Sequence, residues 1–315
     1  MRIEILGATS QIAKDLVQSF STLGQHELTL YARSPERVRL WLASVGLAGR
    51  HAVAEFSAFS TEVPFDALIN FVGVGNPAQA AAMGAAIFDV TLQYDEMALR
   101  YVRQNPVCRY LFLSSGAAYG SSFTSAVNEA TQAQVAINAL QPQDWYAVAK
   151  LHAECRHRAL TDLAIIDLRV FNYFSRTQDL SARFLMTDIV RAIRDQSILA
   201  TSSAYIVRDF LHPADFHQLV SVLLAAPAIN QVVDCYSRAP IDKSTLLACM
   251  QQRFGLQYQV VDSDSGVNAT GIKPYYYSLN TRAANFGFNP IFSSQEGVEQ
   301  EVAAILQPSI QANLL

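Results

Sequence analysis

The sequence has 315 residues, of which 51% are hydrophobic and 16% charged, and its formal net charge is −4. This apolar fraction is enough for a large buried core, which excludes a disordered chain, and the length corresponds to about two domains. The acidity is mild and no run of like charge occurs, so neither nucleic acid nor a membrane surface is an expected partner.

The first 170 residues alternate short apolar runs with segments of helical periodicity. Predicted strands span residues 2–6, 27–31, 51–54, 67–72, 110–114 and 164–168. Predicted helices span residues 11–23, 34–45, 142–161 and a long segment that ends near residue 103. This alternation indicates an α/β fold with a doubly wound parallel sheet of the Rossmann type.

Beyond residue 170 the alternation is less regular. Helical patterns lie near residues 181–195, 213–224, 244–254 and 296–306, with short apolar runs near 206–211, 232–235 and 257–261. We interpret residues 171–315 as a smaller mixed α/β lobe over one end of the sheet, with some segments returning to the sheet. Two long irregular connections, 116–141 and 262–277, have the length that usually carries function.

The compartment is indicated by the cysteines and by the absence of a long apolar segment. The chain has four widely spaced cysteines, Cys108, Cys155, Cys235 and Cys249. They form no zinc-type cluster, so we expect buried free thiols in a reducing environment and no metal site. Residues 1–6 alternate like a strand rather than a signal peptide, and the richest apolar stretch, 219–229, is shorter than the ~20 residues of a membrane helix. We expect a soluble cytoplasmic protein.

The first candidate site is the turn between the first strand and the first helix, residues 7–13. A dinucleotide site at this position needs a tight turn, a close approach of backbone to pyrophosphate, and a helix N-terminus aimed at the charge. Gly7 can provide the turn, whereas Ser10 and Ala13 stand where the dinucleotide fingerprint has glycine. The predicted cofactor residues here are Gly7, Thr9, Ser10, Gln11 and Ile12, with Phe71, Val72 and Gly73 from the end of strand 67–72. An ordinary strand-to-helix turn is the alternative.

The choice of cofactor depends on the end of the second strand. An NAD site places an acidic residue there to hold the ribose, but the sequence has Ala32, Arg33 and Ser34. A guanidinium beside a hydroxyl suits a 2′-phosphate, so Arg33 and Ser34 favour NADP over NAD. The alternative is a solvated helix start with ordinary surface arginines.

Tyr146 and Lys150 lie four residues apart in the predicted helix 142–161 and therefore share one face. A free phenol has a pKa of about 10, and a neighbouring ammonium lowers that pKa, so the pair predicts a group that exchanges a proton during hydride transfer. We assign both residues to the cofactor site as well. Ser115, which follows strand 110–114, is predicted to hydrogen-bond the reacting oxygen. A serine that merely ends a strand is the alternative.

With these motifs, the chain resembles the extended short-chain dehydrogenase/reductase family, which comprises NAD(P)-dependent nucleotide-sugar epimerases, dehydratases and reductases. The resemblance spans essentially the whole length. The family's landmarks occur in their usual order at residues 7–13, 114–120, 146–150, 168–172, 207–215, 277–282 and 286–290.

The resemblance implies roles for individual residues. Ser115, Tyr146 and Lys150 would form the catalytic triad. Asn172, Arg208 and Lys273 would contact the nucleotide diphosphate of the substrate, and Ser115 would contact the substrate as well. The alternatives are that Asn172 caps a strand end and that Arg208 pairs with a neighbouring aspartate, Asp209 or Asp215. A homodimer is also expected, because the long helices near 87–103 and 142–161 can pair with their copies, as is common in the family.

Departures from the family pattern narrow the reaction. The 4,6-dehydratases of the family carry Thr-Asp-Glu at the catalytic strand, whereas this chain has Ser115-Gly116-Ala117 and lacks both carboxylates. Epimerases usually retain NAD and carry the acidic ribose residue that is missing here. We therefore predict an NADP-dependent oxidoreductase that reduces a 4-keto (deoxy) nucleotide sugar, with a dinucleotide-binding domain over residues 1–170 and a substrate lobe over 171–315. A nucleotide-sugar 4-epimerase and a non-catalytic nucleotide sensor are the alternatives.

Overall fold

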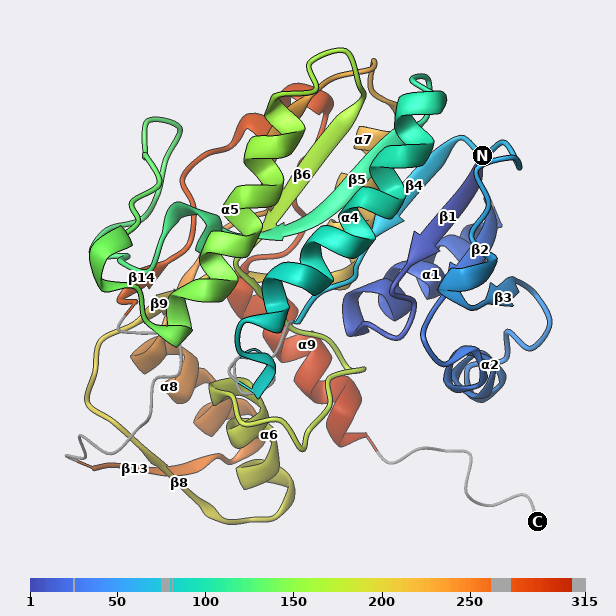
Figure 1. Ribbon diagram of the computed structural model, residues 1–315. Coiled ribbons are helices and arrows are strands. Elements are labelled where there is room, and N and C mark those ends of the chain that lie inside the picture. The colour runs from blue at the N-terminus through green and yellow to red at the C-terminus, as the bar shows by residue number, and fades with distance from the viewer. Residues whose placement is uncertain (25, 75–79, 81, 262–272, 308–315) are drawn as a thin grey trace, which may run out of the picture.

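The structure, a computed structural model, describes residues 1–24, 26–74, 80, 82–261 and 273–307. Its centre is a parallel sheet of seven strands in the order β11-β6-β5-β4-β1-β2-β3 (Figure 1). The strands are β1 (Arg2–Leu6), β2 (Glu27–Tyr31), β3 (Ala52–Ala54), β4 (Ala67–Asn70), β5 (Arg109–Ser115), β6 (Ile165–Val170) and β11 (Gln231–Asp234). Most of the predicted connection 262–277 lies outside the described residues.

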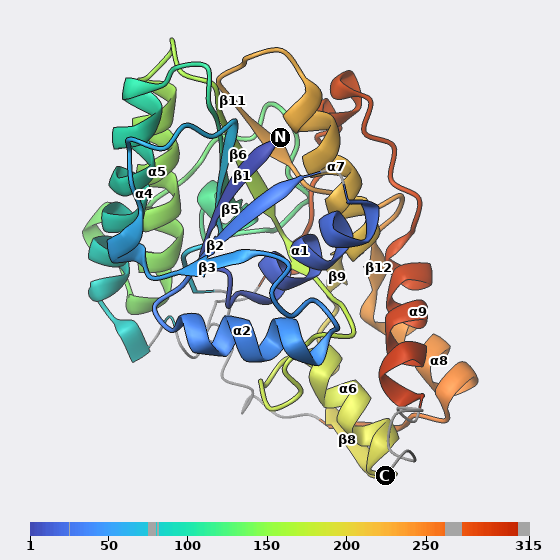
Figure 2. The same ribbon diagram turned by 90° about the vertical axis from the view of Figure 1, so that its right-hand side faces the viewer.

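Helices cover both faces of this sheet (Figure 2). One face packs against α1 (Gln11–Leu23), α2 (Pro35–Ser44) and α7 (Pro213–Ala225). The opposite face packs against α4 (Ala86–Gln104) and α5 (Trp145–Arg158). Because the central strands are buried on both faces, most of β4 and the middle of β5 are continuous apolar runs, whereas β1 and β6 each include a buried carboxylate, Glu4 and Asp167. The arrangement confirms the predicted doubly wound α/β fold.

A smaller lobe lies beside one end of the sheet (Figure 1). Its helices are α6 (Leu185–Arg194), α8 (Lys243–Phe254) and α9 (Ser294–Leu306), which share a separate hydrophobic core. Its short strands are β7 (Asn172–Tyr173), β8 (Ile198–Thr201), β9 (Val207–Arg208), β10 (Phe210–Leu211), β12 (Ile241–Asp242), β13 (Gln257–Val260) and β14 (Tyr275–Tyr276). They form three small sheets, β10-β7, β12-β9-β14 and β13-β8. Two elements of the second half of the chain, α7 and β11, belong instead to the central layers.

Two predicted features differ from the structure. The apolar run 206–211 is not one strand, because the buried carboxylate of Asp209 accepts hydrogen bonds from the Ser237 amide and separates β9 from β10. The two strands consequently join different sheets. The thiols are free, but Cys155 is exposed on α5, so the prediction that all four cysteines are buried was wrong for this one.

A buried group of charges joins α4, α5 and β6, and we call it the His157 network: Asp95, Arg156, His157, Arg158 and Asp167. The imidazole of His157 lies between a carboxylate oxygen of Asp95 at 2.7 Å and one of Asp167 at 2.6 Å. Arg156 and Arg158 each bind one of these carboxylates. Burial alone would lower the pKa of His157, but the two carboxylates raise it to about 9. The imidazole is therefore a cation held between two anions.

Neither a membrane-spanning helix nor a metal-binding cluster is found in the described ranges. No helix there is long and apolar enough to cross a membrane. No group of three or more His, Cys, Asp or Glu side chains in the same ranges is placed to hold a metal ion.

Candidate active site

The turn after β1 is fixed between β2 and the end of β4. Gly7 has a φ of +83°, and a Cβ at this position would lie 2.9 Å from the backbone of Phe71 and Val72. The amides of Gly7 and Ala8 both donate to the Tyr31 carbonyl. Only glycine allows this left-handed turn to run so close to the neighbouring strand. The structure thereby brings two of the predicted cofactor segments, residues 7–12 and 71–73, side by side.

The side chains of this turn have different surroundings. Thr9 is exposed, and Ser10 occupies the N-cap position of α1 without a side-chain capping bond. Gln11 instead donates a hydrogen bond of 2.8 Å to Ser175 in the second half of the chain, and Ile12 packs against the hydrophobic core. Both residues lie at the start of α1, where backbone amide groups can also meet a ligand.

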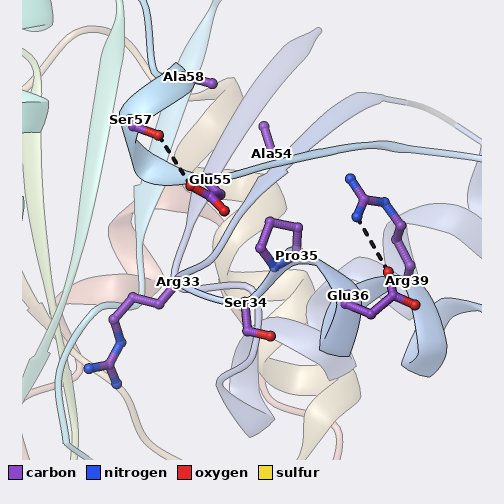
Figure 3. A pocket seen from close by; sticks show the side chains of 9 residues that line it. All are labelled: Arg33, Ser34, Pro35, Glu36, Arg39, Ala54, Glu55, Ser57 and Ala58. Carbon is purple, nitrogen blue, oxygen red and sulfur yellow. Dashed lines mark hydrogen bonds and ion pairs between the residues drawn. The ribbon is translucent and has the colours of Figure 1, made fainter.

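A cavity of about 590 Å³ lies at the carboxyl ends of β2 and β3 (Figure 3). It is lined by Arg33, Ser34, Pro35, Glu36, Arg39, Ala54, Glu55, Ser57 and Ala58. Arg39 pairs with Glu36 at 3.5 Å, whereas Arg33 extends away from that pair. The Ser34 hydroxyl makes no capping bond to α2. The arginine and hydroxyl that the sequence singled out thus both line this open depression.

The three predicted catalytic residues come from two adjacent elements. Tyr146 and Lys150 lie one turn apart on α5, and Ser115 ends β5. Lys150 is buried and its Nζ donates to the Leu113 carbonyl at 2.7 Å. A Cβ on Gly73 would lie 3.3 Å from the same Nζ, so the end of β4 is also in contact with this lysine. The carboxyl ends of β4 and β5 therefore meet α5 at one point.

The pKa of Tyr146 is raised, whereas the sequence predicted a lowered one. Burial raises the pKa of the Tyr146 phenol, and a hydrogen bond from Ser115 opposes that rise. Burial lowers the pKa of Lys150 to about 8, with Glu154 opposing the change. The Lys150 Nζ is held by the Leu113 carbonyl and lies 6.0 Å from the centre of the phenol ring. Burial, and not this ammonium, sets the direction of the Tyr146 pKa shift, and stabilisation of the phenolate by Lys150 stays a prediction. With its pKa raised, the Tyr146 phenol keeps its proton at neutral pH.

The sequence did not predict that a second phenol, that of Tyr276, would lie beside Ser115. The hydroxyl of Tyr276, on β14, lies 3.2 Å from Ser115 Oγ although the two residues are 161 positions apart. Its ring packs edge-on against Phe123 at 4.7 Å and against Phe171 at 5.3 Å between ring centres. Three tyrosines stand in a row at 275–277, and no local pattern tells which one faces the site.

The predicted substrate residues cluster around the same phenol. Lys273 Nζ lies 4.8 Å from the centre of the Tyr276 ring, and the Arg208 guanidinium carbon lies at 5.9 Å. The side-chain amide of Asn172 donates at 3.3 Å to the Tyr276 and Asp209 carbonyls, so this residue holds three segments together. The structure brings Asn172, Arg208 and Lys273 to one side of Ser115.

Arg208 and Lys273 have no acidic partner within the part of the chain that the structure describes. Arg208 donates to the Val207 and Lys273 carbonyls, not to either neighbouring aspartate, so the alternative of an ion pair is wrong. Burial lowers the pKa of Arg208 to about 10. Burial and the repulsion of Arg208 lower the pKa of Lys273 to about 8. Among the described residues, neither side chain forms an ion pair with a carboxylate, and such a pair of cations suits an anionic ligand.

Close packing explains why residue 116 is a glycine. A Cβ at this position would lie 2.3 Å from Cδ1 of the Phe171 ring. That ring belongs to the aromatic cluster around Tyr276. The acidic residue that the dehydratases carry at this place could be accommodated only if Phe171 moved.

The chain is similar to one family model and to several solved structures. The model of the NAD dependent epimerase/dehydratase family matches residues 3–235. No curated protein matches the sequence. Among solved structures, a UDP-glucuronic acid 4-epimerase from Bacillus cereus, in complex with UDP-glucuronic acid and NAD, is similar with a TM-score of 0.75 and 15% identity over 97% of this chain and 99% of that one.

Two further solved structures are similar over nearly their whole length. A dTDP-glucose 4,6-dehydratase from Bacillus anthracis in complex with NAD has a TM-score of 0.77 and 16% identity, over 96% of each chain. A UDP-N-acetylglucosamine 4-epimerase from Methanobrevibacter ruminantium M1 has a TM-score of 0.78 and 13% identity, over 96% of this chain and 97% of that one. At these identities the likeness establishes the fold alone.

Proposed function

Since the chain belongs to the NAD dependent epimerase/dehydratase family, we propose that it is an NADP-dependent reductase of a 4-keto (deoxy) nucleotide sugar. The observation that carries the proposal is the convergence of Ser115, Tyr146 and Lys150 beside the Gly7 turn, together with two cations on the substrate side that pair with no carboxylate among the described residues. A nucleotide-binding turn, a proton donor and an anion site are the parts such a reaction needs.

The protonation state of Tyr146 supports reduction. When bound, the reduced nicotinamide supplies the hydride to the carbonyl carbon. Tyr146, whose raised pKa keeps the phenol protonated at neutral pH, donates its proton to the carbonyl oxygen, which becomes the product hydroxyl. Ser115 donates a hydrogen bond to the same oxygen, and the ammonium of Lys150 stabilises the phenolate that is left. An epimerase begins with the opposite step and needs the phenolate first.

The choice of NADP rests on the cavity at the end of β2. Arg33 is exposed there, it points away from the Glu36–Arg39 pair, and the Ser34 hydroxyl has no capping role. A guanidinium and a hydroxyl can both donate hydrogen bonds to a 2′-phosphate. No carboxylate ends β2, where the ribose of NAD would require one.

The substrate class rests on Arg208 and Lys273. The two cations share one site without a counter-ion among the described residues, which suits the diphosphate of a nucleotide sugar. The solved neighbour from Bacillus cereus binds UDP-glucuronic acid.

We further propose that the protein acts in the cytoplasm as a homodimer joined through α4 and α5, where Leu92 is an exposed apolar side chain. Light scattering coupled to size-exclusion chromatography measures that oligomeric state.

The test is NADPH consumption by the purified protein with UDP-, dTDP-, GDP- and CDP-linked 4-keto-6-deoxy sugars. We expect oxidation of NADPH with at least one of them, slower oxidation of NADH, and no oxidation by the Tyr146→Phe variant. A protein that binds the nucleotides but consumes neither cofactor with any of these sugars would contradict the proposal.

The second candidate is a nucleotide-sugar 4-epimerase, and two of the similar solved structures are 4-epimerases of nucleotide sugars. An epimerase returns its hydride to the same substrate and keeps its nicotinamide bound. An absorbance scan of the purified protein therefore separates the two: bound nicotinamide supports the epimerase, and a protein without it supports the reductase. A non-catalytic sensor would retain its cellular role in the Tyr146→Phe variant.

A further inference from the structure

The hydroxyl of Ser115 has an unusual number of polar neighbours. Its oxygen accepts a hydrogen bond from the Ala117 amide at 3.2 Å and lies 3.2 Å from the Tyr276 hydroxyl. A third group, the Tyr146 phenol, is close enough for a hydrogen bond from Ser115 to lower its pKa. A serine hydroxyl offers one proton and two acceptor positions, so these three contacts can use it fully.

The Ala117 amide fixes the direction of one hydrogen bond, whereas either hydroxyl can donate in the contact between Ser115 and Tyr276. The Ala117 amide can only donate, and it occupies one acceptor position of the Ser115 oxygen. Burial raises the pKa of Tyr276, so this phenol keeps its proton at neutral pH and can donate it in a hydrogen bond. When Tyr276 donates to the second acceptor position, the proton of Ser115 is available only to a third group.

We propose that Tyr276 is a positioning residue that fixes the direction of the Ser115 proton, so that Ser115 donates toward Tyr146 and the substrate carbonyl oxygen. This inference rests on the proposed reductase function and deepens it. It assigns to the substrate lobe a part in arranging the catalytic residues of the sheet, because β14 reaches Ser115 across 161 positions of sequence.

The competing explanation is that Tyr276 only fills space. Its ring contacts Phe123 and Phe171, and a phenylalanine would make the same contacts. The two roles therefore differ only in whether the hydroxyl oxygen of Tyr276 is needed. The neighbouring Tyr275 provides a matched control, because it lies on the same strand and its ring faces Tyr205 at 5.9 Å between ring centres instead of Ser115.

The experiment compares Tyr276→Phe, Tyr275→Phe, Ser115→Ala and the Ser115→Ala/Tyr276→Phe double variant in the full chain. We expect Tyr276→Phe to lower kcat about tenfold, as the loss of one directing hydrogen bond does, with KM and the Kd for NADPH unchanged. Tyr275→Phe should match the wild type. Adding Tyr276→Phe to Ser115→Ala should lower kcat no further, because the first residue acts through the second.

Three results would overturn the inference: wild-type kcat in Tyr276→Phe, a change confined to KM, or an additional loss of kcat in the double variant. Thermal unfolding of the same four proteins gives a readout that needs no turnover. Non-additive Tm losses for Ser115→Ala and Tyr276→Phe support the hydrogen bond, and additive losses contradict it. If the wild type reduces no sugar, the proposed function fails, and the Tm cycle alone decides the inference.

Discussion

Two sets of buried charge, the His157 network and the cations of the candidate active site, differ in their partners. In the His157 network each cation faces a carboxylate, and His157 itself faces two. At the site, Lys150 and Arg208 donate only to backbone carbonyls. The pKa of His157 is raised, whereas the pKa values of Lys150, Arg208 and Lys273 are lowered.

Burial is common to both regions, so the difference comes from pairing. Removing a cation from water disfavours its charged form, and a fixed carboxylate reverses that effect. The His157 network is thus complete within the fold and holds α4 and α5 against β6. The cations of the site are stabilised fully only when an anion approaches. Pairing therefore separates charges that support the structure from charges that are available to a ligand.

The largest effect is expected in the His157 network. Asp167→Asn removes one of the two carboxylates that hold His157, and breaking a buried pair costs about 3–5 kcal/mol of unfolding free energy. Urea unfolding measures the loss. Arg103→Ala is the control, because it breaks a surface pair with Glu96 whose expected worth is below about 1 kcal/mol. Equal losses in the two variants would mean that pairing in the network contributes nothing special.

Lys150→Met should affect activity and stability in opposite directions. We expect kcat to fall about 100-fold, because the cation that stabilises the Tyr146 phenolate is gone. The unfolding free energy at pH 7 should rise by about 1–3 kcal/mol, since the pKa of Lys150 is lowered to about 8 by burial and the folded protein bears that cost. Steady-state kinetics and urea unfolding test the two halves. A less stable variant would show that the bond to the Leu113 carbonyl outweighs burial.

The pH dependence of stability should separate the two regions. The folded pKa of His157, about 9, lies above the ordinary 6.5, so its contribution is complete below about pH 6.5 and disappears as the pH rises through 9. Lys150 and Lys273 have lowered pKa values of about 8, so their contribution has the opposite sign and stability recovers between about pH 8 and 10.5.

The His157 contribution is isolated by subtracting the unfolding free energy of a His157→Gln variant from that of the wild type at each pH. We expect this difference to shrink by a few kcal/mol from pH 6 to pH 9.5. A difference that stays constant over this range would mean that His157 is not a buried cation.

The smallest effect concerns the anion site. Lys273→Met should weaken the binding of UDP about tenfold, as expected for one charge-assisted contact, and Lys14→Met should leave it unchanged. In the wild type, UDP should bind more weakly at pH 9 than at pH 7, because Lys273 loses its proton near pH 8. Calorimetry at both pH values measures both effects. An unchanged Kd in Lys273→Met would remove this lysine from the site.

The sequence by itself determined the layers of this protein. The predicted bounds of β1, α1 and β2 coincide with the observed ones, because burial on one or both faces imposes a local period that can be read from neighbouring residues. The placement of Tyr146 and Lys150 on one helix face has the same local cause.

Only the tertiary structure decided what surrounds those residues. The contact of Tyr276 with Ser115, the bond of Lys150 to the Leu113 carbonyl and the ring of Phe171 over Gly116 join segments that are far apart in the chain. The lowered pKa of Lys273 depends on a neighbour 65 positions away. Periodicity carries no information about such contacts, because they depend on how the lobe packs onto the sheet and not on any pattern within one element.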